Sequence, residues 1–477
     1  MVAQKITIEP VTRIEGHAKI TIRMNDDGTV NHAYLHVNEF RGFEKFCEGR
    51  MVFEMPYITP RICGICPVSH HLAAAKAGDA VMGCPPPRPA ELLRELMHMG
   101  QVVQSHGMHF FELAGPDLLL GFDRDPATRN VVGLLQADAD LTVKAINLRK
   151  WGQEIIRILG GRRIHPVFAI PGGVNKALTA AERDTILAGM AEAIATTQVG
   201  IRIIKDWARQ NAEDIAKFGV FPTGYFGLVT PQNSLELYQG QIRLTGRDGQ
   251  QLEKFAAAHY LDYIAEHVEN WSYLKFPYYK PMGFPGGVYR VGPLGRLNNS
   301  AQIDTPLANA EHQIWKTING GRPVENTLYY HYARLIETLF AIERVGVLLD
   351  DPDILSTDLL NTRHDFKGEG VGVIEAPRGT LLHHYFARPN GQLERVNLIV
   401  STGHNNFAMC EAVDSVAKTY INGQEIREGL LNRVEAAVRA HDPCLSCSTH
   451  AIGQMPMVIN VVDNDGKLLQ TLSRGVE

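Results

Sequence analysis

The chain has 477 residues, of which 45% are hydrophobic and 21% are charged, a composition typical of a large globular protein. Its net charge of −5 argues against nucleic acid as the main partner, and no apolar run is long enough to span a membrane. Seven cysteines are too few for a disulfide framework, their odd number fits a reducing compartment, and the first residues lack the apolar stretch of a signal peptide.

The first forty residues alternate between apolar and polar side chains, a pattern that predicts β structure. Residues 5–8, 18–24 and 30–37 carry this alternation, and the turn-forming run Asn-Asp-Asp-Gly at 25–28 separates the last two segments. We therefore expect a small antiparallel sheet near the N-terminus.

Helical periodicity dominates from about residue 66 onward. Apolar residues at three- and four-residue spacing predict helices over residues 89–113, 131–159, 179–218, 326–349 and 427–440. Thr179 and Glu182 form a capping box at the start of the third of these helices. Turn residues predict hairpins at 240–252 and 458–472. The expected fold is α+β, mainly α: one large helical body around a buried metal site, with peripheral β hairpins or sheet near the N-terminus.

Two Cys-x-x-Cys pairs lie at opposite ends of the chain. Cys63 and Cys66 occur in RICGICPVSH at 61–70, and Cys444 and Cys447 occur in DPCLSCSTH at 442–450. Thiolates are soft ligands that suit zinc, iron–sulfur, copper(I) or nickel. A zinc ribbon closes over about 15–20 residues, whereas 378 positions separate the inner cysteines here. Most of a large fold must therefore wrap around one site.

Spacing alone leaves three kinds of site open: a structural zinc site, a catalytic metal and a redox-active dithiol. Pro67 suits the first turn of a helix, which would place His70 on the same helical face as Cys66 and within reach of a cysteine sulfur. An ordinary core histidine is the alternative. Groups that are costly to bury also recur in three other segments, 13–17, 39–44 and 375–379, each of which taken singly fits a salt-bridged surface or turn.

Taken together, these segments resemble the large, catalytic subunit of the nickel–iron hydrogenases over essentially the whole chain. The motifs occur in the family's order: RIEGH at 13–17, RGFE at 41–44, RICGIC through His70, EAPRG at 375–379 and DPC through His450. Residues 368–373, 378–385 and 442–447 make the chain most similar to the cytoplasmic, NAD-reducing soluble hydrogenases. The resemblance implies reversible heterolytic cleavage of H2 into protons and electrons.

The resemblance also gives each cysteine a role. All four would bind nickel, with Cys63 and Cys444 terminal, while Cys66 and Cys447 would bridge to an iron that also carries cyanide and carbon monoxide. Three further groups resemble the ligands of a nearby magnesium ion, which prefers oxygen donors and keeps several waters: Glu44, His450 and the main-chain carbonyl of Leu398.

The proton and the substrate would be handled by residues around the metals. Cys444 would accept the proton and Glu15 would relay it outward. Arg378 would lie over the open side of the metals and donate to an iron-bound cyanide, with Pro377 and Asp442 shaping that pocket.

Two residues near this pocket carry further expectations. His70 would donate to a cysteine sulfur and tune the thiolate. Other branches of the family often have Asp-His where this chain has Ser105-His106. Because Ser105 carries no charge, we expect Asp442 to be the partner of Arg378.

The electrons must leave through other proteins. The three remaining cysteines are scattered and cannot form a four-cysteine cluster, and the glycine-rich segment at 368–372 lacks the dinucleotide fingerprint, so we expect no NAD site in this chain. The resemblance implies an iron–sulfur small subunit, with flavin- and NAD-binding diaphorase subunits beyond it. A deazaflavin or a heterodisulfide-linked ferredoxin is the alternative acceptor.

The last residues have a separate expectation. In this family a maturation endopeptidase removes a C-terminal extension after metal insertion, which here implies a hydrogenase domain at 1–450 and an extension at 451–477. A permanent terminal hairpin is the alternative. Two readings from other classes also stay open: a non-catalytic subunit resembling the quinone-site subunit of respiratory complex I, which lacks the four cysteines, and a zinc-stabilised scaffold.

Overall fold

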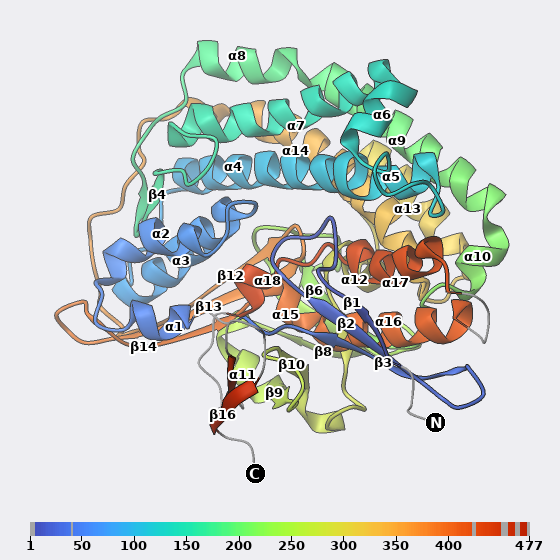
Figure 1. Cartoon of the computed structure of the whole chain (residues 1–477). Coiled ribbons are helices and arrows are strands. Elements are labelled where there is room, and N and C mark those ends of the chain that lie inside the picture. Colours follow the sequence, from blue (N-terminus) through green and yellow to red (C-terminus); the bar gives the residue numbers. More distant parts are fainter. Residues whose placement is uncertain (1–4, 40–41, 422–425, 450–456, 463–467, 475–477) are drawn as a thin grey trace.

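A layer of long helices covers a group of small sheets (Figure 1). The computed structural model describes residues 5–39, 42–421, 426–449, 457–462 and 468–474. At the centre of the helical layer, α4 (Arg88–Gly107) packs against α7 (Ala139–Gly160) and α14 (Tyr330–Leu349), and α9 (Met190–Gln210) packs against both of these partners. The fold is α+β and mainly helical, as the sequence predicted.

The N-terminal sheet is confirmed. Its antiparallel strands are β1 (Lys5–Ile8), β2 (Lys19–Met24) and β3 (Val30–His36). The apolar side chains of β2 and β3 join a core with helices α16 (Asn406–Tyr420) and α17 (Glu428–Ala440), so segments from opposite ends of the chain pack together.

A second three-stranded sheet lies against helix α3 (Pro67–Met82) and was not predicted. Its strands are β12 (Glu369–Ala376), β13 (Gly379–Ala387) and β14 (Leu393–Ile399), and β12 and β13 are almost wholly buried. Burial on both faces removes the alternation that marks an exposed strand, which explains the omission. Gly372 lets the helix approach closely, because a Cβ there would lie 2.1 Å from the Ala73 carbonyl oxygen.

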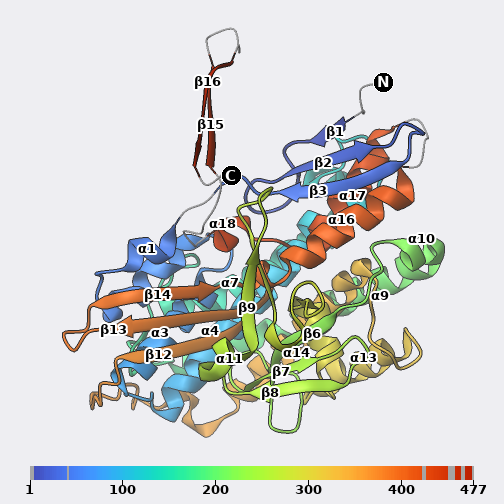
Figure 2. The same ribbon diagram turned by 90° about the horizontal axis from the view of Figure 1, so that it is seen from below.

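The remaining strands form short hairpins and one mixed sheet. The hairpin predicted at 240–252 is confirmed, and so is the C-terminal hairpin, which extends away from the rest of the chain in Figure 2. The mixed sheet has the order β11-β6-β7-β8, and a separate pair joins β9 to β10. Their bounds are β6 Gly224–Val229, β7 Gln241–Thr245, β8 Gln251–Phe255, β9 Ile264–Val268, β10 Lys275–Tyr279, β11 Tyr289–Arg290, β15 Met457–Val462 and β16 Leu468–Arg474, with β4 at Ala169–Ile170 and β5 at Gly173–Val174.

Several predicted helices are interrupted. The helix expected at 131–159 breaks at Asp138, whose carboxylate accepts a hydrogen bond from the Leu141 amide at 3.0 Å and caps α7. The capping box at Thr179 is confirmed, but the helix expected at 179–218 breaks into three. Beyond α4 the chain continues through a π-helical turn, Met108–Ala114. The other helices are α1 Phe43–Cys47, α2 Met55–Ile58, α5 Gly115–Leu120, α6 Val131–Ala137, α8 Ala180–Ala188, α10 Ala212–Lys217, α11 Tyr260–Tyr263, α12 Gly292–Asn299, α13 Pro306–Thr317, α15 Ser401–His404 and α18 Leu445–Ser448.

A helix that spans a membrane must be both long and apolar. Across the ranges that the structure describes, no helix is both long enough and apolar enough to cross a bilayer.

Candidate metal centre

The four cysteines of the two Cys-x-x-Cys pairs meet inside the protein. Their sulfurs all lie within 4.8 Å of one another, and all four residues are buried. The Cys444 sulfur lies 3.1 Å from that of Cys63 and 3.0 Å from that of Cys447, and the Cys66 and Cys447 sulfurs are 3.6 Å apart. All seven cysteines of the chain lie in the described ranges, and none forms a disulfide.

Local backbone structure brings the two pairs together. Cys66 precedes α3, with Pro67 in the first helical turn where its missing N–H costs nothing. After α17, Asp442 adopts a left-handed conformation, with φ of 56°, and redirects the chain toward Cys444. The Cys444 amide then donates to the Thr402 hydroxyl at 2.9 Å, which fixes the start of α18.

The electrostatics of the cluster favour a bound cation. Hydrogen bonds from the neighbouring thiols lower the pKa of Cys63, whereas burial raises the pKa of Cys444 and of Cys447. Four thiolates in so small a buried volume repel one another, and soft metal ions both neutralise and bind them. The residues present therefore fit a nickel- and iron-binding centre.

Arg378 projects from a two-residue turn beside the cysteines. Pro377 and Arg378 form the turn between β12 and β13, and the Arg378 side chain is buried. Its guanidinium donates to the Asp442 carboxylate at 3.0 Å and to the Ser105 hydroxyl at 3.4 Å. Burial lowers the pKa of Arg378, but attraction to Asp442 and to the thiolates of Cys66 and its neighbours outweighs it and raises the pKa overall. The expected ion pair with Asp442 is therefore present.

His70 reaches a sulfur from the opposite end of the chain. Its Nε2 lies 3.4 Å from the sulfur of Cys447, and its Nδ1 lies 3.1 Å from Nε2 of His383. His383 Nδ1 in turn lies 2.6 Å from the hydroxyl of Tyr385. Cys447, His70, His383 and Tyr385 are all buried. Their contacts form a continuous hydrogen-bonded chain from the cysteine cluster into sheet β12–β14.

Glu15 lies directly against the second cysteine pair. Its backbone forms a parallel bridge with Cys444, and the Leu445 amide donates to its carbonyl at 3.1 Å. Its carboxylate accepts a hydrogen bond from the Ser446 amide at 3.1 Å. Glu15 is only partly buried, whereas Cys444 is fully buried.

Two of the three expected magnesium ligands are adjacent. The Leu398 amide donates to the Glu44 carboxylate at 2.7 Å, and burial raises the pKa of Glu44. Leu398 pairs with His383 in the β13–β14 ladder, which links this position to the hydrogen-bonded chain from Cys447. His450 lies outside the described residues.

Sequence reasoning missed several residues that support the site. The side-chain amides of Gln101 and Gln104 each donate to the Ile65 carbonyl at 3.0 Å and hold the first Cys-x-x-Cys loop. His383 and Tyr385 belong to the family-like segment 378–385, and their two-residue spacing places them on one face of a strand. No sequence pattern indicates that Arg296 supports the site, because its hydrogen-bond partners, Glu337 and Glu375, lie in distant parts of the sequence.

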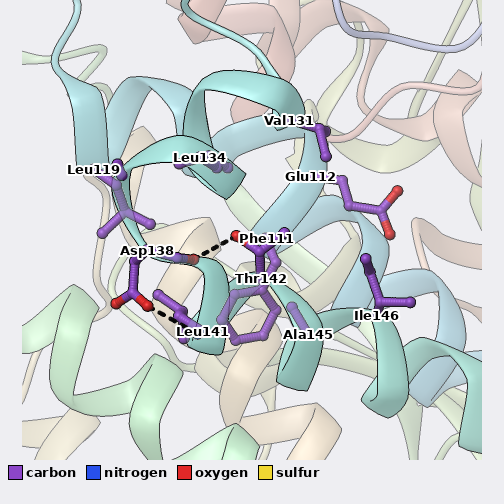
Figure 3. A pocket seen from close by; sticks show the side chains of 11 residues that line it. Phe111, Glu112, Leu119, Val131, Leu134, Asp138, Leu141, Thr142, Ala145 and Ile146 are labelled. Atoms are coloured by element: carbon purple, nitrogen blue, oxygen red, sulfur yellow. Dashed lines mark hydrogen bonds between the residues drawn. The ribbon is translucent and has the colours of Figure 1, made fainter.

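A pocket on the helical layer is separate from the cysteines. Figure 3 shows a hollow between α5, α6 and α7. In it the Asp138 carboxylate accepts a hydrogen bond from the Leu141 amide, and the Asp138 main-chain carbonyl accepts one from the Thr142 hydroxyl. Glu112 at its edge is paired with Arg149. Because both of its acidic groups are engaged, the hollow does not compete with the cysteine cluster as a reactive site. It is lined by Phe111, Glu112, Leu119, Val131, Leu134, Ala137, Asp138, Leu141, Thr142, Ala145 and Ile146.

Known proteins match this chain along its whole length. It is 44% identical to the NAD-reducing hydrogenase HoxS subunit beta of Cupriavidus necator, over 99% of this chain and 100% of that one. It is also 44% identical to a subunit of the vhu F420-non-reducing hydrogenase of Methanocaldococcus jannaschii, over 87% and 99% of the two chains.

Solved structures agree with these relatives. A crystal structure of an NAD+-reducing [NiFe]-hydrogenase in the H2-reduced state superposes with a TM-score of 0.91 at 46% identity, covering 94% of this chain and 99% of that chain. The Ni-Fe-Se hydrogenase of D. vulgaris Hildenborough shares the fold, with a TM-score of 0.77 at 23% identity over 94% and 100% of the chains. A HoxL-like profile matches residues 5–40, and the nickel-dependent hydrogenase profile matches residues 41–121 and 227–450. The chain therefore belongs to the nickel-dependent hydrogenase family.

Proposed function

We propose that this chain is the catalytic subunit of a hydrogenase that reversibly cleaves H2 into protons and electrons. The observation that carries the proposal is the buried set of four cysteine sulfurs within 4.8 Å of one another. A structural zinc clip needs only a short local loop, whereas here two segments that are far apart in the sequence of a large helical body meet at the sulfurs. The two readings from other classes, a zinc-stabilised scaffold and a complex-I-like subunit, explain neither this convergence nor the family match.

The ligands divide into terminal and bridging sulfurs. Cys63 and Cys444 would be terminal on nickel, and Cys66 and Cys447 would bridge nickel to an iron that carries cyanide and carbon monoxide. Nickel and iron, when bound there, supply the Lewis acidity that makes H2 acidic enough to split. The 3.4 Å approach of His70 to Cys447 supports a bridging thiolate at Cys447, because a hydrogen-bond donor disperses charge on a shared sulfur.

Cys444 and Glu15 form the proposed exit for the proton. Cys444 would hold the proton on its sulfur first, and the Glu15 carboxylate would then pass it outward. The backbone bridge between these residues and the partial burial of Glu15 support this order, because they place one end of the relay inside and the other near solvent.

Arg378 has a separate proposed role on the substrate side. Its guanidinium would polarise H2 and donate to the iron-bound cyanide, while Pro377 and Asp442 define its position. Its burial next to the cysteine cluster and its ion pair with Asp442 support this role, since a fixed charge acts strongly where water is excluded.

A magnesium ion at Glu44, Leu398 and His450 completes the proposed centre. The hydrogen bond from the Leu398 amide to Glu44 supports it only by bringing the Glu44 carboxylate next to the backbone of Leu398, whose carbonyl oxygen is of the kind that a hard cation prefers. Such an ion would be connected to Cys447 indirectly, through the strand pairing of Leu398 with His383 and the contacts of His383 with His70 and of His70 with Cys447.

Electrons would pass first to an iron–sulfur small subunit. From there they would reach NAD through flavin- and NAD-binding diaphorase subunits. Similarity to an NAD-reducing hydrogenase subunit supports this acceptor. The equal identity to an F420-non-reducing hydrogenase subunit supports a second candidate, transfer to a different acceptor through other partner subunits.

The location and the maturation of the chain are further parts of the proposal. We place the complex in the cytoplasm, supported by seven cysteines without a disulfide, the state expected in a reducing compartment. We also propose that an endopeptidase cuts between His450 and Ala451. The tail lies directly beyond Cys444 and Cys447, so its removal after metal insertion would lock both ligands in place. Intact-mass analysis of the active complex decides this, because retention of residues 451–477 there refutes cleavage.

Metal analysis of the whole purified complex tests the central proposal. We expect about one nickel for each copy of this chain and more than one iron, because the clusters of the small subunit add iron to that of the centre, together with infrared bands of cyanide and carbon monoxide on iron. Cys63→Ser should remove nickel, whereas Cys84→Ser, at a buried cysteine outside the cluster, should keep it. Zinc in place of nickel and iron, with no H2 turnover, would overturn the proposal.

A further inference from the structure

Arg296 holds the turn that carries Arg378. It lies on α12 and is completely buried, and all five of its N–H groups are engaged. Two of its bonds go to the turn itself, to the Ala376 carbonyl at 2.9 Å and the Pro377 carbonyl at 3.2 Å. The peptide units on either side of Pro377 are therefore tied to α12.

Two buried carboxylates complete this arrangement. Arg296 donates to both oxygens of Glu337 at 2.6 Å and to Glu375 at 2.7 Å. Burial lowers the pKa of Arg296, but attraction to Glu337 and Glu375 outweighs this effect and raises the pKa overall. Glu375 is the third residue before Arg378 and also accepts bonds from the Leu228 amide and the Thr380 hydroxyl. The residues on the two sides of the turn are thus both connected to Arg296: Glu375 binds it directly, and Thr380 binds Glu375.

A second connection reaches the tip of Arg378. His106 Nε2 lies 3.0 Å from the Glu337 carboxylate, and the preceding residue, Ser105, receives a hydrogen bond from Arg378. Arg296 therefore supports Arg378 at its backbone through the turn and at its guanidinium through Glu337 and α4.

Close backbone packing leaves the turn little freedom to move. Gly292 begins α12 with φ of 77°, and a Cβ there would lie 2.9 Å from the Arg378 carbonyl oxygen. On β6, a Cβ at Gly227 would lie 3.0 Å from Cγ of Arg296. The helix that bears Arg296 thus abuts the turn directly, and a glycine leaves room for the arginine side chain.

We propose that Arg296 is a positioning residue for the hydrogenase reaction: it fixes Arg378 beside the four cysteines without touching substrate or metal. The inference rests on the proposed function, in which Arg378 acts on H2. Lysine cannot replace Arg296, because an ammonium group lacks the planar fork that binds two carboxylates and two carbonyls together.

The test uses Arg296→Lys in the assembled complex, with Arg94→Lys as the matched control. Arg94 is equally buried and binds both oxygens of Asp79 together with the carbonyls of Ile170 and Gly173, but its partners belong to α3 and the β4–β5 hairpin. Both substitutions should lower the melting temperature. At unchanged nickel and iron content, only Arg296→Lys should lose about 10- to 100-fold in H2 oxidation, the loss typical of a misplaced active-site group, and shift the infrared bands of iron-bound cyanide.

A double-substitution cycle separates positioning from general damage. If Arg296 acts through Arg378, Arg296→Lys should lower the rate by less than about 2-fold in the Arg378→Lys background. Full additivity there, or an equal loss of rate in Arg94→Lys, would overturn the proposal. If Arg296→Lys does not assemble, Glu337→Gln takes its place, since it keeps the acceptor shape and removes one charge.

The same measurements distinguish this inference from the proposed function. A metal-loaded wild-type complex without H2 turnover contradicts the proposed function itself. Full activity of Arg378→Lys contradicts the role of Arg378 and overturns the positioning role with it. If the wild type turns over normally but the rate losses of Arg296→Lys and Arg378→Lys are additive, only the positioning role of Arg296 is overturned.

Discussion

The imidazole Nε2 of His70 lies 3.4 Å from the sulfur of Cys447, a residue 377 positions away in the sequence. Helical spacing placed His70 near the first cysteine pair, yet its ring contacts the second pair. His383, held by the hydroxyl of Tyr385, faces the other ring nitrogen and fixes the orientation of His70. The histidine therefore joins the two halves of the metal centre.

Replacing His70 should impair turnover without unfolding the protein. His70→Ala removes the contact with Cys447, and losses of about 10- to 100-fold are typical when the partner of a metal ligand is removed. The measurement is the H2 oxidation rate of the purified complex for each nickel bound.

The neighbouring His71 supplies the control for this prediction. It is equally buried, but it connects the Pro56 carbonyl with the Ala169 amide and contacts no cysteine. His71→Ala should lower the melting temperature while the folded, metal-loaded fraction keeps its rate. Equal losses of rate in both variants would contradict a specific role of His70.

Asp442 should matter more than Ser105 for the function of Arg378. Asp442→Asn removes the countercharge from a buried guanidinium, and we expect a rate loss of about 10- to 100-fold. Ser105→Ala removes a 3.4 Å contact, and because so long a hydrogen bond is weak, the rate should change by less than about 3-fold. Steady-state H2 oxidation by both variants decides this, and a larger loss in Ser105→Ala would show that the hydroxyl is the main support.

Gly16 should be essential for the contact between Glu15 and the second cysteine pair. Its φ is 83°, and a Cβ there would lie 2.7 Å from Cβ of Leu445. Gly16→Ala should cost about 1 kcal/mol in backbone strain and a further 1–3 kcal/mol, roughly, from the clash.

The matched control for Gly16 is Gly49, which has a φ of 79° and open space around its Cβ position. Gly49→Ala should therefore show only the backbone cost. Denaturant titrations of both variants measure the difference, and equal destabilisation would mean that α18 yields to the added methyl group.

Buried histidines should make stability fall in mild acid. Burial lowers the pKa of His312 to about 4, and its Nε2 lies 3.0 Å from the Leu297 carbonyl oxygen. The unfolded chain binds a proton near pH 6.5, where the folded chain does not, so stability falls as pH drops from about 6.5 toward 4, by up to roughly 1.4 kcal/mol per pH unit.

Unfolding temperatures measured between pH 7 and pH 5 test this prediction. His312→Gln should show a shallower decline than the wild type, because one such histidine is gone. A wild-type slope that His312→Gln does not change would contradict the prediction.

Local signals were sufficient for several elements and insufficient for others. Turn residues and alternation correctly predicted the N-terminal strands, because each strand has one buried and one more exposed face. Strands β12 and β13 lacked that contrast, since they are buried on both faces. The break at Asp138 had a readable signal, a capping side chain three residues before Leu141, but the apolar pattern around it was continuous.

The sequence by itself determined the chemistry of this protein: four thiols in two matched pairs, with flanking motifs specific enough to indicate a nickel–iron hydrogenase. These features are local, so residue type and spacing carry them. Only the tertiary structure decided which side chains support the site. His70 does so through its contact with Cys447, and Arg296 through its hydrogen bonds to the turn that carries Arg378. Such contacts join residues far apart in the chain, and their geometry depends on how whole helices and sheets pack, which no short sequence pattern encodes.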